Sequence, residues 1–255
     1  MAGPPYLTDD PEPTDYQHFE IYSFSNGTVT RDGTSGEGGI DFNYGAAPNL
    51  QLTTTLPVGY GVSPSGPLVG GLSNIELAAK YRFLMQDNAG LDVSFFPRVF
   101  LPSASSNVGE QHASFLLPIW MEKDWGQWSA FGGGGCEINR GGDSQDFCLM
   151  GAVLTRQIVP NLQVGLELFH QTSDTRGGEA TTSSAPGSVT TSTTTTIFWG
   201  MSAAASRTRI RRTVSIGTHL FFSRFNIRMM PSAIGTAQDK GIRSKKLYKY
   251  SLIFH

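Results

Sequence analysis

The chain has 255 residues, a formal net charge of −2 and 39% hydrophobic residues, so it is long enough for one large domain. No stretch reaches the roughly 20 consecutive apolar residues that a membrane-spanning helix requires, which excludes a helical membrane protein. Two cysteines without nearby histidines are too few ligands for a metal site. We therefore expect no metal and no cofactor.

Acidic and basic residues are divided unevenly along the chain. Residues 1–205 hold 8 of the 19 basic residues and 20 of the 21 acidic ones, whereas residues 206–255 hold 11 basic residues and one acid, Asp239. The arginines between Arg207 and Arg212 resemble a nucleic-acid patch in charge alone. Because the rest of the chain is acidic and would repel phosphates, we expect no nucleic-acid partner.

The predicted elements begin with an irregular segment and continue as strands. Residues 1–16 are rich in proline and aspartate, which predicts an extended segment without regular structure. From residue 17 onward, short segments alternate apolar and polar side chains with a period of two, as strands with two different faces do. We predict ten strands in this part of the chain: Gln17–Phe24, Gly38–Tyr44, Leu50–Pro57, Ile75–Leu84, Leu91–Val99, Ser114–Glu122, Gln127–Ile138, Phe147–Ile158, Leu162–Gln171 and Thr190–Ile197.

Short and long connections alternate between these strands. The short ones are Gly45–Asn49, Gln86–Gly90, Asp124–Gly126 and Val159–Asn161. The long ones are Asn26–Gly36, Val58–Gly71, Pro102–Glu110, Asn139–Asp146 and Ser173–Ser188. Tight turns at one end of a sheet and long loops at the other are typical of outer-membrane barrels. With Thr213–Phe222 and Lys246–Phe254 as closing strands, the sequence predicts an all-β fold, an antiparallel up-and-down transmembrane β-barrel of about 12 strands over residues 17–255.

Each predicted strand has one apolar and one polar face. In a membrane barrel the apolar faces contact lipid and the polar faces line the lumen. Charged residues on the polar faces either form salt bridges that rigidify the barrel or line a water-filled passage. The residues that we expect to line the lumen are Glu20, Asp41, Glu76, Lys80, Arg82, Asp92, Arg98, Glu122 and Glu167.

Two further patterns concern covalent chemistry. Cys136 and Cys148 flank one predicted loop and come within reach of a disulfide if their strands pair, with two free thiols as the alternative. The sequence has no Gly-x-Ser-x-Gly motif of a serine hydrolase, and no lysine of a phosphate-binding loop follows Gly132–Gly135. We therefore expect that the protein is not an enzyme and has no catalytic residues.

The N-terminal fifth of the chain resembles a known family. Gly3–Tyr16 reads GPPYLTDDPEPTDY, and with Arg31–Gly33 and Asn43–Leu52 it is similar to the outer-membrane protein family of the meta pathway of phenol degradation. The similarity is looser up to about Thr196. The resemblance implies a porin or transporter of the Gram-negative outer membrane, with membrane lipid and a small solute as its partners. It also implies passive transport of small solutes, among them aromatic or hydrophobic compounds.

Both ends of the chain leave alternatives open. Residues 198–255 depart from the family pattern. Either a frameshift in the source gene or a basic tail that binds anionic lipid would explain this departure. Residues 1–5 lack the charged and apolar regions of a signal peptide, which predicts a mature exported form or a truncated start. Residues 1–16 would lie at the periplasmic mouth or tuck into the lumen.

A different class of protein remains compatible with the same strands. In a soluble, secreted or periplasmic β-barrel or β-sandwich that binds a ligand, the apolar faces would pack in a dry interior. The two interpretations therefore predict opposite surroundings for the same side chains, which are Phe42, Leu77, Phe95, Leu117 and Leu166.

Overall fold

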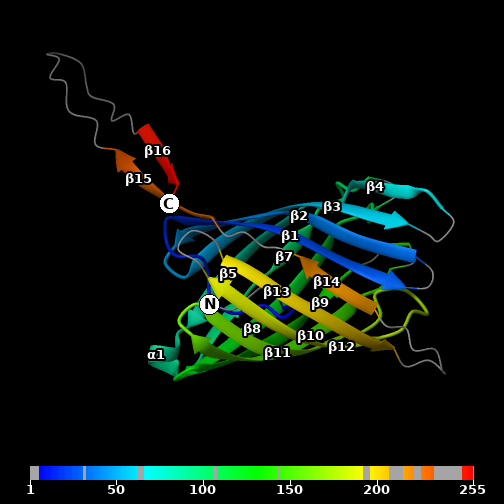
Figure 1. Ribbon diagram of the computed structural model, residues 1–255. Helices are drawn as coiled ribbons and strands as arrows, with labels where there is room; N and C mark the ends of the chain where they lie inside the picture. The colour runs from blue at the N-terminus through cyan, green and yellow to red at the C-terminus, as the bar shows by residue number, and fades with distance from the viewer. Residues whose placement is uncertain are drawn as a thin grey trace, which may run out of the picture.

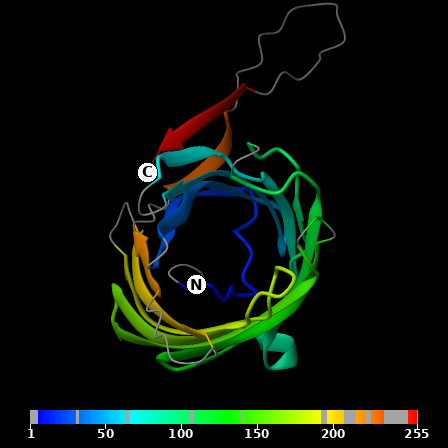
Figure 2. The ribbon, with the colours of Figure 1, turned by 90° about the vertical axis from the view of Figure 1, so that its right-hand side faces the viewer.

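A computed structural model describes residues 6–30, 33–62, 66–105, 108–139, 141–142, 144–191, 196–206, 215–220, 225–232 and 249–254. Antiparallel strands wrap around a common axis in this structure (Figures 1 and 2). The helix α1 (Gln86–Ala89) is four residues long, and no helix in the described part of the chain is long and apolar enough to cross a membrane. The strands are β1 (His18–Thr30), β2 (Gly33–Ala47), β3 (Leu50–Val62), β4 (Leu68–Leu72), β5 (Glu76–Leu84), β6 (Asp92–Phe95), β7 (Arg98–Phe100), β8 (Ser114–Trp125), β9 (Trp128–Ile138), β10 (Phe147–Val159), β11 (Leu162–Gln171), β12 (Thr181–Thr191), β13 (Thr196–Ser206), β14 (Ser215–Leu220), β15 (Phe225–Ser232) and β16 (Lys249–Phe254).

Strands that follow one another in the sequence are neighbours in the sheet, which is an up-and-down topology. From β8 to β14 each strand pairs with the next, and β1, β2, β3 and β5 do the same on the other side. The strands β6 and β7 occupy one position between β5 and β8, and β4 pairs with β3 beyond the end of β5. The ring closes where β14 lies beside β1 (Figures 1 and 2). The described strands thus form a barrel wall with 12 positions, and the predicted fold class is confirmed.

The last strands differ from the prediction. Lys246–Phe254 was expected to close the barrel, but β16 within it pairs with β15. Residues 225–228 of β15 pair with the start of β1, and the hairpin of β15 and β16 projects away from the ring (Figure 2). Ser215–Leu220, inside the predicted strand Thr213–Phe222, is the strand that reaches β1. The arginine cluster from Arg207 to Arg212 lies outside the described residues.

A serine- and threonine-rich strand was also misplaced by the prediction. Residues 181–188 were expected to belong to a loop, yet β12 pairs one-to-one with β11 from Thr181 opposite Gln171 to Thr190 opposite Leu162. Because serine and threonine lie on both faces of this strand, its sequence lacks the period of two that marks the other strands. Threonine nevertheless favours extended backbone, which fits a strand between two others.

The side chains on the two faces of the wall have different surroundings. All five residues that distinguish a membrane barrel from a soluble sandwich are exposed on the outer face: Phe42, Leu77, Phe95, Leu117 and Leu166. Charged residues such as Lys80 and Glu167 are buried on the inner face. An apolar outside around a charged inside is the reverse of a soluble protein, so the alternative of a dry apolar interior does not describe this wall.

Short turns gather at one end of the barrel. Asn49 adopts a φ of 62° between β2 and β3, and Gly126 has a φ of 62° between β8 and β9, a conformation that asparagine and glycine tolerate. Helix α1 fills the third short connection and ends at Gly90, whose φ is 81°. Near these turns Trp125 and Trp128 are exposed on the outside, as aromatic residues are at a membrane interface.

Candidate functional site

The N-terminal segment, residues 6–16, lies inside the barrel and crosses its lumen (Figure 2). It enters at the short-turn end, where the Gln17 amide donates to the Gly45 carbonyl over 2.8 Å. It then contacts inner side chains on both halves of the wall, from Gln51 on β3 to Glu167 on β11. Of the two positions predicted for this segment, the structure shows the one inside the lumen.

Asp9 of the N-terminal segment binds two basic side chains of the wall. One carboxylate oxygen lies 3.0 Å from Lys80 Nζ on β5, and the other lies 2.8 Å from Arg98 Nη2 on β7. Arg98 also contacts Glu76 over 3.6 Å, and both basic groups lie over the ring of the buried Phe96, at 4.8 Å for Lys80 and 4.3 Å for Arg98. Charge-assisted pairs that share one carboxylate hold the segment to this side of the barrel.

Asp9 and Asp10 are neighbours, but their carboxyl groups titrate differently. Burial alone would raise the pKa of Asp9, yet the charges of Lys80 and Arg98 outweigh it and lower that pKa below its ordinary value. Burial raises the pKa of Asp10 well above the ordinary value, and the nearby charge of Asp9 adds to this effect although Lys80 opposes it. The ionised form of Asp9 therefore favours the docked segment, whereas the ionised form of Asp10 opposes it.

Amide and hydroxyl groups hold the C-terminal half of the segment. The Thr14 amide donates to Gln51 Oε1 over 2.8 Å. Gln51 Nε2 in turn donates to Asn43 Oδ1 over 2.8 Å, and the Thr53 hydroxyl donates to the same oxygen over 2.6 Å. Gly45 lies so close to the Asp15 carbonyl that a Cβ at this position would overlap it. The wall is thus shaped to accept the backbone of the segment.

The opposite wall contacts the first residues of the segment. The Thr8 amide donates to Glu167 Oε1 over 2.6 Å, and the Tyr6 ring meets the edge of Phe131 with 5.9 Å between centroids. Cβ atoms on Gly151 and Gly165 would overlap the side chains of Thr8 and Tyr6, respectively. Glycines thus leave room for the segment on this wall too.

A cavity of about 440 Å³ remains beside the segment inside the barrel. Both the segment and the wall line it, and five of the nine charged residues that the sequence placed in the lumen are among its lining residues: Glu20, Asp41, Glu76, Lys80 and Arg98. Asp41 accepts a hydrogen bond from the Thr55 hydroxyl, and Glu20 accepts one from the Tyr22 hydroxyl over 2.8 Å. Charged and polar side chains therefore surround this space.

The other four predicted lumen residues make contacts elsewhere. Arg82 and Asp92 face each other at 3.5 Å near the short turns, where Asp92 also accepts a hydrogen bond from the Gln86 amide. Glu122 accepts a hydrogen bond from the Ser129 hydroxyl, and Glu167 accepts the hydrogen bond from the Thr8 amide. The structure thus divides the predicted set into residues that line the cavity and residues that brace the wall or the segment.

Several residues of the site were missed by the sequence reasoning. Asp9 and Asp10 belong to a segment without periodicity, so no strand pattern pointed to them. Phe96 comes directly before Pro97, where the wall position shared by β6 and β7 is interrupted, and its ring turns inward. The available signals were the excess of acids in residues 9–15 and the three bases on predicted inward faces, Lys80, Arg82 and Arg98.

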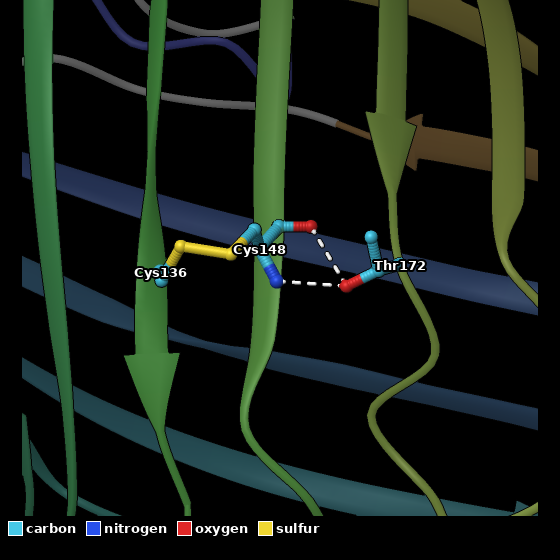
Figure 3. The surroundings of a disulfide bond; sticks show 3 residues. All are labelled: Cys136, Cys148 and Thr172. Atoms are coloured by element: carbon cyan, nitrogen blue, oxygen red, sulfur yellow. Dashed lines mark hydrogen bonds between the residues drawn. A yellow bond between two sulfur atoms is a disulfide. The ribbon is translucent and has the colours of Figure 1, made fainter.

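The two cysteines form a disulfide across neighbouring strands. Cys136 on β9 and Cys148 on β10 are directly opposite in the ladder, with 3.9 Å between their Cα atoms, and their sulfur atoms are bonded (Figure 3). On the other side of Cys148, the Thr172 hydroxyl accepts the Cys148 amide over 2.8 Å and donates to its carbonyl over 3.3 Å. These contacts fasten the long-loop ends of β9, β10 and β11 to one another.

Comparison with solved structures identifies the class of the fold. The COG4313 outer membrane channel from Pseudomonas putida F1 is similar with a TM-score of 0.63 and 13% sequence identity, over 89% of this chain and 98% of that one. A KdgM porin in complex with disordered oligogalacturonate is similar with a TM-score of 0.50 and 10% identity, over 80% of this chain and 99% of that one. At such identities the likeness concerns the fold, which is that of outer membrane β-barrels. No protein-family model and no curated protein sequence matches the chain.

Proposed function

We propose that the protein is a passive channel of the bacterial outer membrane for small solutes, and that the N-terminal segment narrows its lumen. One observation carries this proposal: a barrel with apolar outer side chains encloses a cavity of about 440 Å³ among charged groups. This volume is within the usual range for cavities that hold small molecules. The two similar proteins named above are a channel and a porin, which supports transport rather than catalysis.

The charged residues of the inner face have two roles in this proposal. Lys80, Arg98 and Glu76 hold the N-terminal segment in place through Asp9. The pair of Arg82 and Asp92 keeps the wall rigid near the short turns. Solutes then diffuse past the segment without energy coupling, and the lining of the cavity decides which ones pass.

We further propose that the transported solutes include aromatic or other hydrophobic compounds. The resemblance to the phenol-degradation family supports them, and so do three apolar side chains on the inner face, Leu116, Trp120 and Phe131. Because these side chains are at most 5% exposed with the segment in place, an apolar solute would reach them after the segment shifts. Uptake of a small aromatic compound into liposomes tests this part separately.

Single-channel conductance in planar bilayers tests the channel itself. The purified full-length chain, with its folding checked by heat-modifiable migration on a gel, should give small current steps. Deletion of residues 2–15 should increase them at least about twofold because the segment fills much of the lumen. Gly45→Ala displaces the segment without a deletion and should also increase the conductance. Gly61→Ala is the matched control, because a Cβ at Gly61 meets nothing within 4 Å. Folded protein that conducts no current in either the full-length or the deleted form would contradict the proposal.

A further inference from the structure

Acidic residues outnumber basic residues around the cavity. Among the described residues that line it, eight are acidic and two, Lys80 and Arg98, are basic. Four of the acids belong to the N-terminal segment: Asp9, Asp10, Glu12 and Asp15. The other four belong to the wall: Glu20, Glu37, Asp41 and Glu76. The segment thus supplies half of the acidic groups and none of the basic ones.

Both basic groups already have acidic partners when the segment is docked. Lys80 Nζ lies 3.0 Å from Asp9 and 3.5 Å from Asp10, and Arg98 contacts Asp9 and Glu76 over 2.8 Å and 3.6 Å. An anion entering the cavity therefore finds cations that carboxylates have neutralised. A mobile cation finds more carboxylates than bases, even when Asp10, whose ionised form burial disfavours, is left out. Acidic rings have this role in cation channels.

Without the segment the same wall would have a different balance. Four wall acids would remain with two bases, and both Lys80 and Arg98 would lose the carboxylate of Asp9. Lys80 would then be available to anions, whereas Arg98 would keep its contact with Glu76 of the wall. The segment therefore changes the electrostatic character of the passage as well as its width.

We propose that the N-terminal segment is the charge filter of the channel and makes it selective for cationic solutes. This inference rests on the proposed channel function and deepens it. The carboxylates concentrate cations in the narrow passage, and the segment keeps the two inner bases occupied. Organic ammonium compounds and inorganic cations are the solutes that this filter favours over anions of the same size.

Reversal potentials in a potassium chloride gradient test the filter. The full-length chain should prefer potassium over chloride by at least about fivefold, as an acidic passage concentrates cations. Deletion of residues 2–15 should increase the conductance and bring this ratio close to about one, because most of the acidic excess is lost.

Two charge variants separate the effect of the acidic groups on selectivity from the effect of the width of the passage on conductance. The double variant Glu12→Gln with Asp15→Asn removes two exposed carboxylates of the segment and leaves the Asp9 contacts intact, so selectivity should fall about twofold or more at unchanged conductance. Asp87→Asn removes an acid from α1 outside the lumen and should leave the selectivity unchanged. A conducting full-length channel without cation preference, or an unchanged ratio in the double variant, would overturn the filter. Absence of current in every form would instead count against the channel function.

Discussion

At the scale of single residues, one carboxylate organises the lumen. Asp9 connects Lys80 and Arg98, two bases that lie on different strands and over the same aromatic ring. Its lowered pKa means that its contribution is present above the pKa of an unfolded aspartate and is lost as the pH falls through the lower value of the folded state. The pKa of Asp10 is raised instead, so its ionisation opposes docking of the segment at neutral pH.

These opposite signs predict opposite effects of two similar substitutions. Asp9→Asn should expose the N-terminal segment and speed its proteolysis in detergent at pH 7 by about tenfold or more, since a charged hydrogen bond contributes roughly 1.5–3 kcal/mol. In Asp10→Asn the segment should be cleaved as slowly as in the parent, or more slowly, because this substitution removes a carboxyl group whose ionised form burial disfavours. Equal protection in Asp9→Asn and the parent would contradict the role given to Asp9.

At the scale of elements, the period of two was sufficient to locate most of the wall. Ile75–Leu84 was predicted as a strand with Glu76 and Lys80 inward, and β5 runs from Glu76 to Leu84 with Lys80 buried. The same reasoning misplaced β12, because serine and threonine on both faces remove the contrast on which the pattern depends. Local sequence cannot show which strands meet when both faces are alike.

The N-terminal segment shows a second limit of sequence reasoning. Its composition predicted an extended chain without regular structure and left open whether it lies at the mouth or in the lumen. The answer depends on groups far away in the sequence, such as Gln51 and Glu167, and on the space left by Gly45 and Gly151. Cavities and their linings arise from the closed ring, and no stretch of sequence contains that information.

The disulfide between β9 and β10 leads to a prediction about the stability of the wall. Its cysteines are 12 positions apart and close a short loop, so replacing both with serine should lower the free energy of unfolding by about 2–3 kcal/mol. Urea unfolding in detergent micelles measures the difference, and a reducing agent should destabilise the parent but leave the double variant unchanged. Equal stability of parent and variant without reductant would show that the bond contributes nothing.

At the scale of the whole molecule, the barrel separates two solvents with one layer of strands. Apolar residues such as Leu77 and Leu117 face outward, and charged residues such as Lys80 face a lumen that the N-terminal segment crosses. The short turns with Trp125 and Trp128 are at one end, and the disulfide is toward the other. Lipid contact, the proposed narrow passage and its proposed charge filter all require this arrangement.

Spin labels on the reconstituted protein test this arrangement most directly. Labels at Leu77, Leu117 and Leu166 should collide more often with oxygen, which dissolves in lipid, than with a water-soluble nickel complex. Labels at Ala78 and Thr53 on inner faces should show the reverse order, and a label at Thr14 should be shielded from both reagents until residues 6–16 are displaced. If the nickel complex collided with the labels at Leu77, Leu117 and Leu166 as often as oxygen does, the membrane barrel on which the proposed channel depends would be contradicted.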